Sequence, residues 1–354
     1  MNLVSPLYSR THLSAAFAVL LLALPCSAQR VCTGDCGGDG RVTVDEIVVG
    51  TNVALGEDDL AACAAFDRDN GLGVEVDEIV AGVNYALAGC PLTTVADAAF
   101  WQTLHGESDR QQEAIELFQQ AVDADPNDSR SHFLLGMTHL YRFGRGLSGY
   151  DSFDDAAKQE IVLANASLDL AVLHAPENRA YPGFRGAATY MNGVVHDDQA
   201  LVDLGLERLR ASIELWPLFN RFSFLGTVAA VAPAGSPLFD ESFAYLLDAL
   251  SPEGLFDCTS RLCGDAGLAP RNLAGSGLVF GDIFAKGGDV TRARGWYQLS
   301  ANFGGGSDWA FTALARDRVD TVEERVALYE DEDPSNDPQL AGLGAENCAI
   351  CHNR

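Results

Sequence analysis

The sequence predicts an all-α protein in which a stack of helical hairpins follows a small domain of two acidic loops. Two observations predict this fold. Small and large apolar residues recur at helical spacing, each time ahead of a proline, between residues 93 and 305. Before them, one acidic loop-and-helix segment occurs twice. A composition of 47% hydrophobic and 21% charged residues excludes a largely disordered chain.

Residues 1–28 have the pattern of a secretory signal peptide. A weakly basic start with Arg10 precedes an apolar run over 13–24, and small residues lead to an expected cleavage site after Ala28. The alternative is a lipoprotein signal anchored at Cys26, against which the preceding Pro25 argues. No other stretch approaches the ~20 apolar residues of a membrane span, so none is expected. The signal predicts a periplasmic or extracellular location.

The net charge of −27 disfavours nucleic acid and anionic lipid as partners and suits divalent cations. The cysteines that remain after cleavage are expected to form disulfides in an oxidising compartment. Four of them lie in 32–90, where three pairings are possible and the sequence does not choose among them. Cys258 and Cys263 are expected to close a small loop. The full set is Cys32, Cys36, Cys63, Cys90, Cys258, Cys263, Cys348 and Cys351.

The duplicated segment lies in a predicted module over 30–92 and has the pattern of an oxygen cage for Ca²⁺. Such a loop places oxygen ligands at alternate positions and a bidentate carboxylate at the twelfth. The first loop offers Asp35, Asp39, the carbonyl of Arg41, and Glu46, with Gly40 at the sharp turn. The second loop offers Asp67, Asp69, the carbonyl of Gly73, and Glu78. Gly71 and Leu72 stand at a ligand and a turn position of the second loop, which predicts a weaker site.

This module resembles the EF-hand-like pairs of dockerin domains. The resemblance implies calcium binding and a cohesin-like partner that contacts small hydroxylated residues near the end of each loop. Here Val44-Asp45 and Val76-Asp77 stand at those places, which argues against a cohesin partner but leaves the calcium ligands intact. Two alternatives stay open: an acidic turn without metal, or calcium that only braces a module with a thin core.

Between 93 and 305, small residues at fixed spacing predict the close contact of two helices, and a proline predicts the end of the second. Three such sets are Ala114, Phe118, Ala121, Pro126; Ala164, Leu168, Ala171, Pro176; and Gly205, Leu209, Ser212, Pro217. Gly136 and Gly186 mark the crossing points of other helices, and a last hairpin is expected from the spacing of Gly281, Phe284, Ala293, Tyr297 and Ser300. This pattern resembles the tetratricopeptide repeat. The resemblance implies a superhelix whose concave surface holds a protein or peptide partner.

Residues 306–354 are expected to form a C-terminal helix and an acidic linker that ends in Cys-x-x-Cys-His. Cys348, Cys351 and His352 have the spacing that attaches haem c, with the histidine as an axial ligand of the iron. A plain disulfide is the alternative, and the absence of a second such cluster in the sequence argues against zinc. Candidates for a sixth ligand are Met137, Met191, His132, His139 and His196.

The sequence contains no Gly-x-Ser-x-Gly elbow, phosphate-binding loop or zinc-protease helix motif. We therefore expect a binding or scaffold protein rather than an enzyme. Electron transfer by a cytochrome-like chain is the alternative function, and an extracellular assembly component without haem is another.

Overall fold

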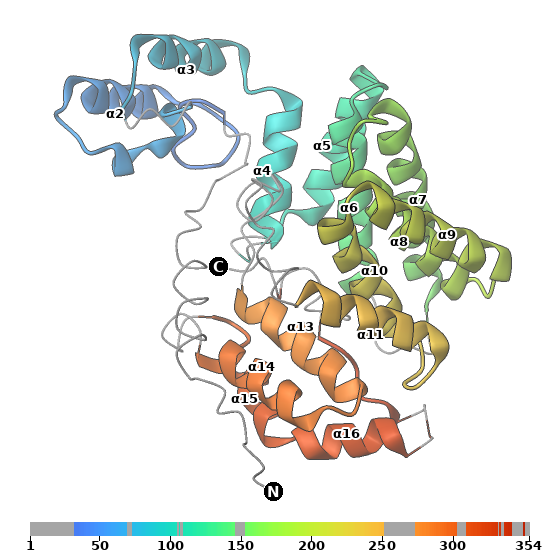
Figure 1. Ribbon diagram of the computed structural model, residues 1–354. Coiled ribbons are helices and arrows are strands. Elements are labelled where there is room, and N and C mark those ends of the chain that lie inside the picture. Colours follow the sequence, from blue (N-terminus) through green and yellow to red (C-terminus); the bar gives the residue numbers. More distant parts are fainter. Residues whose placement is uncertain are drawn as a thin grey trace, which may run out of the picture.

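A computed structural model describes residues 32–68, 73–104, 106, 109–145, 153–250, 273–302, 309–331, 333, 336–341 and 350. Over these residues the regular structure is entirely helical and contains no strand, which confirms the all-α class. A pair of short helices, α2 and α3, lies at one end of the molecule, and the remaining helices form the body beside it (Figure 1).

The N-terminal module consists of two loops that each run into a helix. Helix α2 spans Val44–Leu55 and α3 spans Val76–Ala88, and the short 3-10 helices Leu60–Ala62 and Ala64–Phe66 lie between them. Both α-helices begin in a capping box, formed by Thr43 with Glu46 and by Glu75 with Glu78. Each box satisfies backbone N–H groups that would otherwise have no partner in the first turn. The repeated sequence therefore produces the same local structure twice.

Phe66 forms the centre of this module and is fully buried. Its ring packs against Gly50 of α2 and Gly82 of α3, which occupy equivalent places in the two repeats. Gly34, the residue equivalent to Phe66 in the first repeat, also faces the ring, and a Cβ there would lie 2.9 Å from Cζ. One aromatic ring and three glycines thus fill an axis that has no room for a second ring.

Two disulfides close the module, joining Cys32 to Cys90 and Cys36 to Cys63. The first ties the beginning of the module to its end across 58 residues, and the second ties the first loop to the 3-10 segment. The structure therefore selects one of the three pairings that the sequence left open. Disulfides are typical of oxidising compartments outside the cytoplasm. Cys258 and Cys263 lie outside the described residues.

The body is a series of helical hairpins, and each hairpin packs on the next along the chain. The pairs are α4 (Leu92–Leu104) with α5 (Gln111–Ala124), α6 (Ser129–Arg145) with α7 (Asp155–His174), α8 (Tyr181–Val195) with α9 (Gln199–Leu215), α10 (Pro217–Val231) with α11 (Pro237–Ala249), and α13 (Leu273–Lys286) with α14 (Val290–Asn302). Two shorter helices follow, α15 (Thr312–Asp320) and α16 (Val322–Glu330).

The glycines that the sequence analysis places at crossing points do lie between paired helices. A Cβ at Gly136 would lie 2.7 Å from Cγ of Leu168, and one at Gly186 would lie 2.8 Å from the backbone nitrogen of Leu209. Gly281 of α13 packs in the same way on the ring of Tyr297 of α14. Close approach of the two backbones therefore requires glycine at these positions.

Prolines mark the ends of three second helices, as expected. Helices α5, α7 and α9 end at Ala124, His174 and Leu215, two residues before Pro126, Pro176 and Pro217 respectively. The last of these prolines also begins α10, where its missing N–H costs nothing because the first turn of a helix has no acceptor for it.

Aromatic side chains connect the first helices of successive hairpins. Phe133 of α6 stacks on Tyr181 of α8 with ring centroids 4.3 Å apart. Farther along the chain, Phe184 contacts Phe219 of α10. A third contact joins Phe222 of α10 to Phe280 of α13. These contacts give the body one continuous apolar core.

The described C-terminal residues contain helices and one extended segment. Two helices, α15 and α16, occupy 312–330, and the segment 336–341 packs on them instead of extending into solvent. Leu340 and Ala341 are buried, because the segment supplies an apolar pair to the core.

No single helix in the described residues is long and apolar enough to cross a membrane. Helices α3 and α4 reach the length and composition of a membrane span only when taken together, and the chain bends by 95° between them.

Candidate functional site

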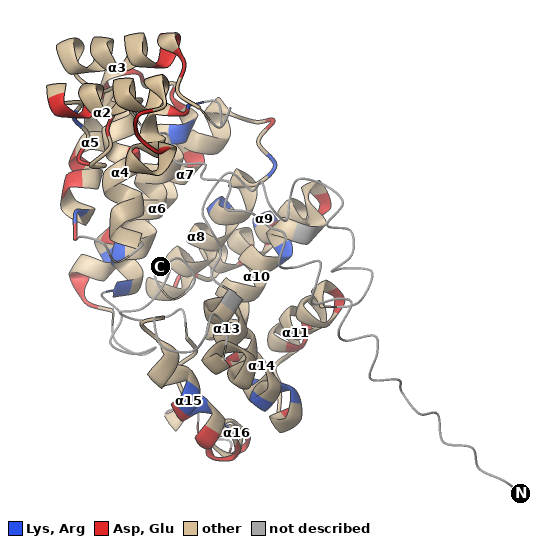
Figure 2. Ribbon diagram, turned by 90° about the vertical axis from the view of Figure 1, so that its left-hand side faces the viewer, with Lys and Arg blue, Asp and Glu red and all other residues tan. Residues whose placement is uncertain are grey.

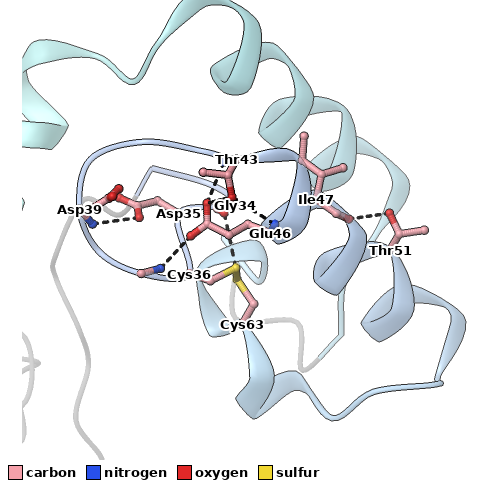
Figure 3. Close-up of a disulfide and its surroundings, with 10 residues drawn as sticks. Gly34, Asp35, Cys36, Asp39, Thr43, Glu46, Ile47, Thr51 and Cys63 are labelled. Carbon is pink, nitrogen blue, oxygen red and sulfur yellow. Dashed lines mark hydrogen bonds between the residues drawn. A yellow bond between two sulfur atoms is a disulfide. The ribbon is translucent and has the colours of Figure 1, made fainter.

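The first acidic loop is closed by hydrogen bonds from its own backbone to Asp35 and Glu46 (Figure 3). Asp35 is buried and accepts from the N–H groups of Asp39 (3.1 Å) and Gly40 (2.7 Å). Glu46 accepts from Gly37 N–H (2.9 Å) through one oxygen and from Thr43 N–H (2.8 Å) through the other. The two carboxylates therefore hold the beginning and the end of the loop together.

The turn within this loop depends on glycine. Gly38 and Gly40 have φ values of 66° and 86°, a region that residues with a side chain rarely adopt. This confirms the expectation that Gly40 stands at the sharp turn. The loop passes from Asp35 through Arg41 to the capping box of α2, so all of its predicted ligands lie within the described residues.

The second loop closes in the same way at its helical end. Glu78 is buried and accepts from Arg68 N–H (2.7 Å) through one oxygen and from Glu75 N–H (2.9 Å) through the other. Asp67 and Gly73 are described, whereas Asp69 lies with 70–72 outside the described residues. The glutamate at the twelfth position therefore closes its loop in both repeats.

The charges of the first loop repel one another. Burial raises the pKa of the Asp35 carboxyl, and the negative charges of Asp39 and Glu46 raise it further, while hydrogen bonds from Gly40 and Asp39 act in the opposite direction. Burial also acts to raise the pKa of Glu46, but hydrogen bonds from Thr43 and Gly37 outweigh it and leave that pKa lowered. Three carboxylates thus lie close enough to interact, and a divalent cation among them would relieve their repulsion.

Within the described residues, no group of three or more His, Cys, Asp or Glu side chains is arranged as a metal site. Both oxygens of Glu46 instead accept hydrogen bonds from Thr43 and Gly37. A bidentate contact between Glu46 and a cation would have to compete with these bonds. Calcium in either loop therefore stays a prediction.

The first loop also contacts the body of the protein. Gln102 of α4 donates from Nε2 to the carbonyl of Gly38 (2.5 Å), and a Cβ at Gly40 would lie 2.6 Å from a methyl group of Val95 on the same helix. Arg110 donates to Oε1 of Gln102 (2.8 Å) and forms an ion pair with Glu113. Sequence reasoning missed Gln102 and Arg110, because nothing in the local pattern shows that α4 lies against the loop.

Arg110 brings a positive charge to the same region. Its pKa is raised first by the hydrogen bond to Glu113, and the negative charges of Asp39 and Asp35 raise it as well. The guanidinium therefore lies within electrostatic reach of the loop and reduces its negative potential. A cation bound in the loop would be repelled by Arg110, so the charge of this residue opposes calcium affinity.

Of the C-terminal motif, only Ile350 lies within the described residues, while Cys348, Cys351 and His352 lie outside them. Ile350 is 1% exposed and belongs to the main hydrophobic core. In the sequence this residue stands between the two cysteines.

The expected sixth ligands already have other interactions. His139 Nδ1 lies 2.7 Å from Oε2 of Glu160, and His132 Nε2 lies 2.9 Å from the carbonyl of Pro126. His196 Nδ1 lies 3.0 Å from the carbonyl of Asn192. Met191 is buried and Met137 is partly buried against the core. The structure thus gives each of the five a structural role.

No family model matches this chain, and no curated protein or solved structure is significantly similar to it.

Proposed function

We propose that this chain is an exported scaffold protein with a calcium-binding N-terminal module, a tetratricopeptide-like stack that holds a protein or peptide partner, and one covalent haem. The observation that carries the calcium part is the equivalent closure of the two loops. Glu46 and Glu78 stand at the same place in each repeat and close it through the same pair of oxygens. A glutamate that closes the loop at the twelfth position of both repeats supports two calcium sites.

Calcium binding is tested by the thermal unfolding of the full chain. Ligand that binds only the folded state stabilises it by RT ln(1 + [L]/Kd), about 2.7 kcal/mol at a hundredfold excess over Kd. Millimolar Ca²⁺ should raise the melting temperature, and Glu46→Gln should remove more of this rise than Glu78→Gln. Asp45→Asn is the matched control, because it removes an exposed charge from the same helical turn without removing a predicted ligand. A melting temperature unmoved by Ca²⁺ would refute the ligand assignment.

Docking of a protein partner on the module is supported by apolar side chains that both repeats expose alike. Val44 and Val76 are 74% and 79% exposed, and Val48 and Val80 are 52% and 53% exposed. Leu55 and Leu87 repeat the pattern at the ends of the two helices. Apolar residues scattered singly are normal on a surface, but the exposure of the same apolar positions in both repeats supports a common binding role.

Docking on the module is tested with cohesins, the partner class that the resemblance to dockerins implies. Immobilised cohesin modules should retain the full chain in the presence of Ca²⁺, and Val48→Lys with Val80→Lys should abolish retention. Leu173→Lys is the matched control, since Leu173 is an exposed leucine on α7, away from the module. Failure of every cohesin to bind would leave the helical stack as the docking region.

Haem attachment is supported by the burial of Ile350 within the Cys-x-x-Cys-His motif. A haem needs apolar cover, and Ile350, a residue of the motif, belongs to the hydrophobic core. Cys348 and Cys351 would hold the porphyrin through thioethers, and His352 would ligate the iron. The haem would supply one-electron chemistry there.

The haem is tested by the intact mass of protein exported from a host that matures c-type cytochromes. The expected mass exceeds that of the polypeptide by one haem, and a Soret band accompanies it. Cys348→Ser with Cys351→Ser should abolish attachment, and His352→Ala should alter the spectrum. A colourless protein whose mass is two hydrogens below that expected with Cys348 and Cys351 as free thiols would instead identify a disulfide between them.

A further inference from the structure

The segment 336–341 is held by hydrogen bonds to its main chain. Tyr329 of α16 donates to the carbonyl of Pro338 (2.5 Å), and Arg325 and Arg318 donate to the carbonyl of Gln339 (3.1 and 3.3 Å). The N–H of Ala341 donates to Oδ2 of Asp282 on α13 (2.5 Å). Residues 337–340 have no helical or turn structure of their own, so these side chains take the place of backbone partners.

The side chains that bind the segment also interact with one another. Asp282 is fully buried and accepts from the hydroxyl of Tyr297 (2.6 Å) and from Arg325 (3.1 Å) through Oδ1. Nε of Arg318 lies 3.3 Å from the same oxygen. The side chains of Arg318 and Arg325 are 15% and 7% exposed. A buried, interlinked set of this kind presents its remaining donors and acceptor in a rigid geometry.

The side chains of the segment differ in their exposure. Leu340 and Ala341 are buried, while the side chains before them lie nearer the surface. Asp337 lies within electrostatic reach of Lys286. Recognition therefore needs an extended main chain, one leucine followed by a small residue, and an acidic residue upstream.

Basic side chains lie at both ends of the receiving site. Arg318 and Arg325 flank the buried carboxylate of Asp282, and Lys286 lies within electrostatic reach of Asp337 in the segment. Figure 2 shows acidic residues along many helices, and α15 carries both acidic and basic residues. An acidic side chain at the place of Asp337 is favoured by the charge of Lys286, and residues 330–333 upstream are acidic as well.

We propose that Asp282, Arg318, Arg325 and Tyr329 form a binding site for an extended acidic peptide with a leucine anchor, and that 336–341 is its resident and exchangeable ligand. This inference deepens the scaffold function proposed above, because it names the site and the chemistry of the peptide partner. An external peptide has to displace the chain's own segment, which is present at high effective concentration. The resident segment thus lowers the apparent affinity of the site for competitors.

The test uses the full chain and a labelled peptide with the sequence of 333–343. Leu340→Asp places a charge in the buried position and releases the segment, while the four receiving side chains remain unchanged. Fluorescence anisotropy should show the peptide binding to this variant at least ~10-fold more tightly than to the wild type, in which the site is occupied. Adding Tyr329→Phe should weaken this binding several-fold, and a peptide with Asp for the leucine should not bind.

If Leu340→Asp loses its helical circular dichroism, the same titration is made on wild-type protein cut at a protease site introduced in 331–335 after folding. A folded variant or cut protein that does not bind the peptide at ~100 µM, a concentration far above a low-micromolar Kd, would overturn the proposal. Equal binding by the wild type and Leu340→Asp would also overturn it, since the peptide would then bind elsewhere. Either failure leaves the calcium and haem results unaffected, because they are read from other segments.

Discussion

The ring of Phe66 lies directly against Gly82, so that a Cβ at position 82 would lie 2.6 Å from Cε1 of the ring. Gly50 meets the other side of the same ring from the first repeat. Helices α2 and α3 are therefore joined through one buried side chain, and their separation is set by the absence of a side chain at two equivalent positions.

Gly82→Ala is expected to destabilise the module by about 1–3 kcal/mol, because overpacking forces the ring or the helix to move. Urea unfolding of the full chain measures the change. Phe66→Leu in the same chain should recover part of the loss, since a smaller side chain makes room for the methyl group. Gly73→Ala is the control: nothing lies within 4 Å of a Cβ there. Equal stability of Gly82→Ala and wild type would contradict the close packing.

Peptide mapping of unreduced protein should find Cys32 linked to Cys90 and Cys36 linked to Cys63. Replacing the first pair with serine should cost roughly 4 kcal/mol and replacing the second slightly less, since the stabilisation grows with the length of the closed loop. Differential scanning calorimetry of both variants gives the comparison. A peptide that links Cys32 to Cys36 would show that the chain adopts a different pairing.

Lys286 should make stability depend on pH. Its side chain is buried, with Nζ 3.1 Å from the carbonyl of Ala229 and near the rings of Phe239 and Tyr329. Burial lowers its pKa to about 8, against which the charge of Asp337 acts. The unfolded chain therefore binds more protons than the folded one between pH 8 and the ordinary lysine pKa of 10.5, so stability rises with pH through this window.

The measurement compares wild type with Lys286→Met by urea unfolding at pH 7.5 and at pH 10. The stability of the variant relative to wild type should fall by about 2 kcal/mol over this range, because groups other than Lys286 cancel in the difference. A difference that stays constant with pH would show that the lysine keeps its ordinary pKa in the folded protein.

Asn220 should tolerate substitution poorly. It is fully buried on α10, and its Nδ2 donates to the carbonyls of Arg179 (2.9 Å) and Ser212 (2.6 Å), which joins three consecutive segments of the body. Asn220→Asp replaces this donor with a charge that faces two carbonyls, at an expected cost of about 3 kcal/mol or more. Loss of helical circular dichroism in urea measures it. Asn302→Asp is the matched control, because Asn302 makes a similar bond at the surface. Similar urea midpoints for Asn220→Asp and Asn302→Asp would contradict this structural role of Asn220.

Much of the fold could be predicted because it depends on local signals. Thr43 with Glu46 forms a capping box within four residues, and Pro126 follows α5 closely. Gly136 meets Leu168 because two neighbouring helices of one hairpin are brought together by the short path of the chain. Helical spacing, caps and prolines act over a few residues, so the sequence alone determined the helical class, the ends of α5, α7 and α9 and the duplication of the acidic loop.

Only the tertiary structure decided which distant residues meet. Gly38 receives its hydrogen bond from Gln102, 64 positions later, and Asp282 receives one from Ala341, 59 positions later. The pairing of the four early cysteines and the sharing of Phe66 by two glycines are of the same kind. Each contact exists because packing of the whole chain brings the partners together at once, and no local pattern of residues carries that information.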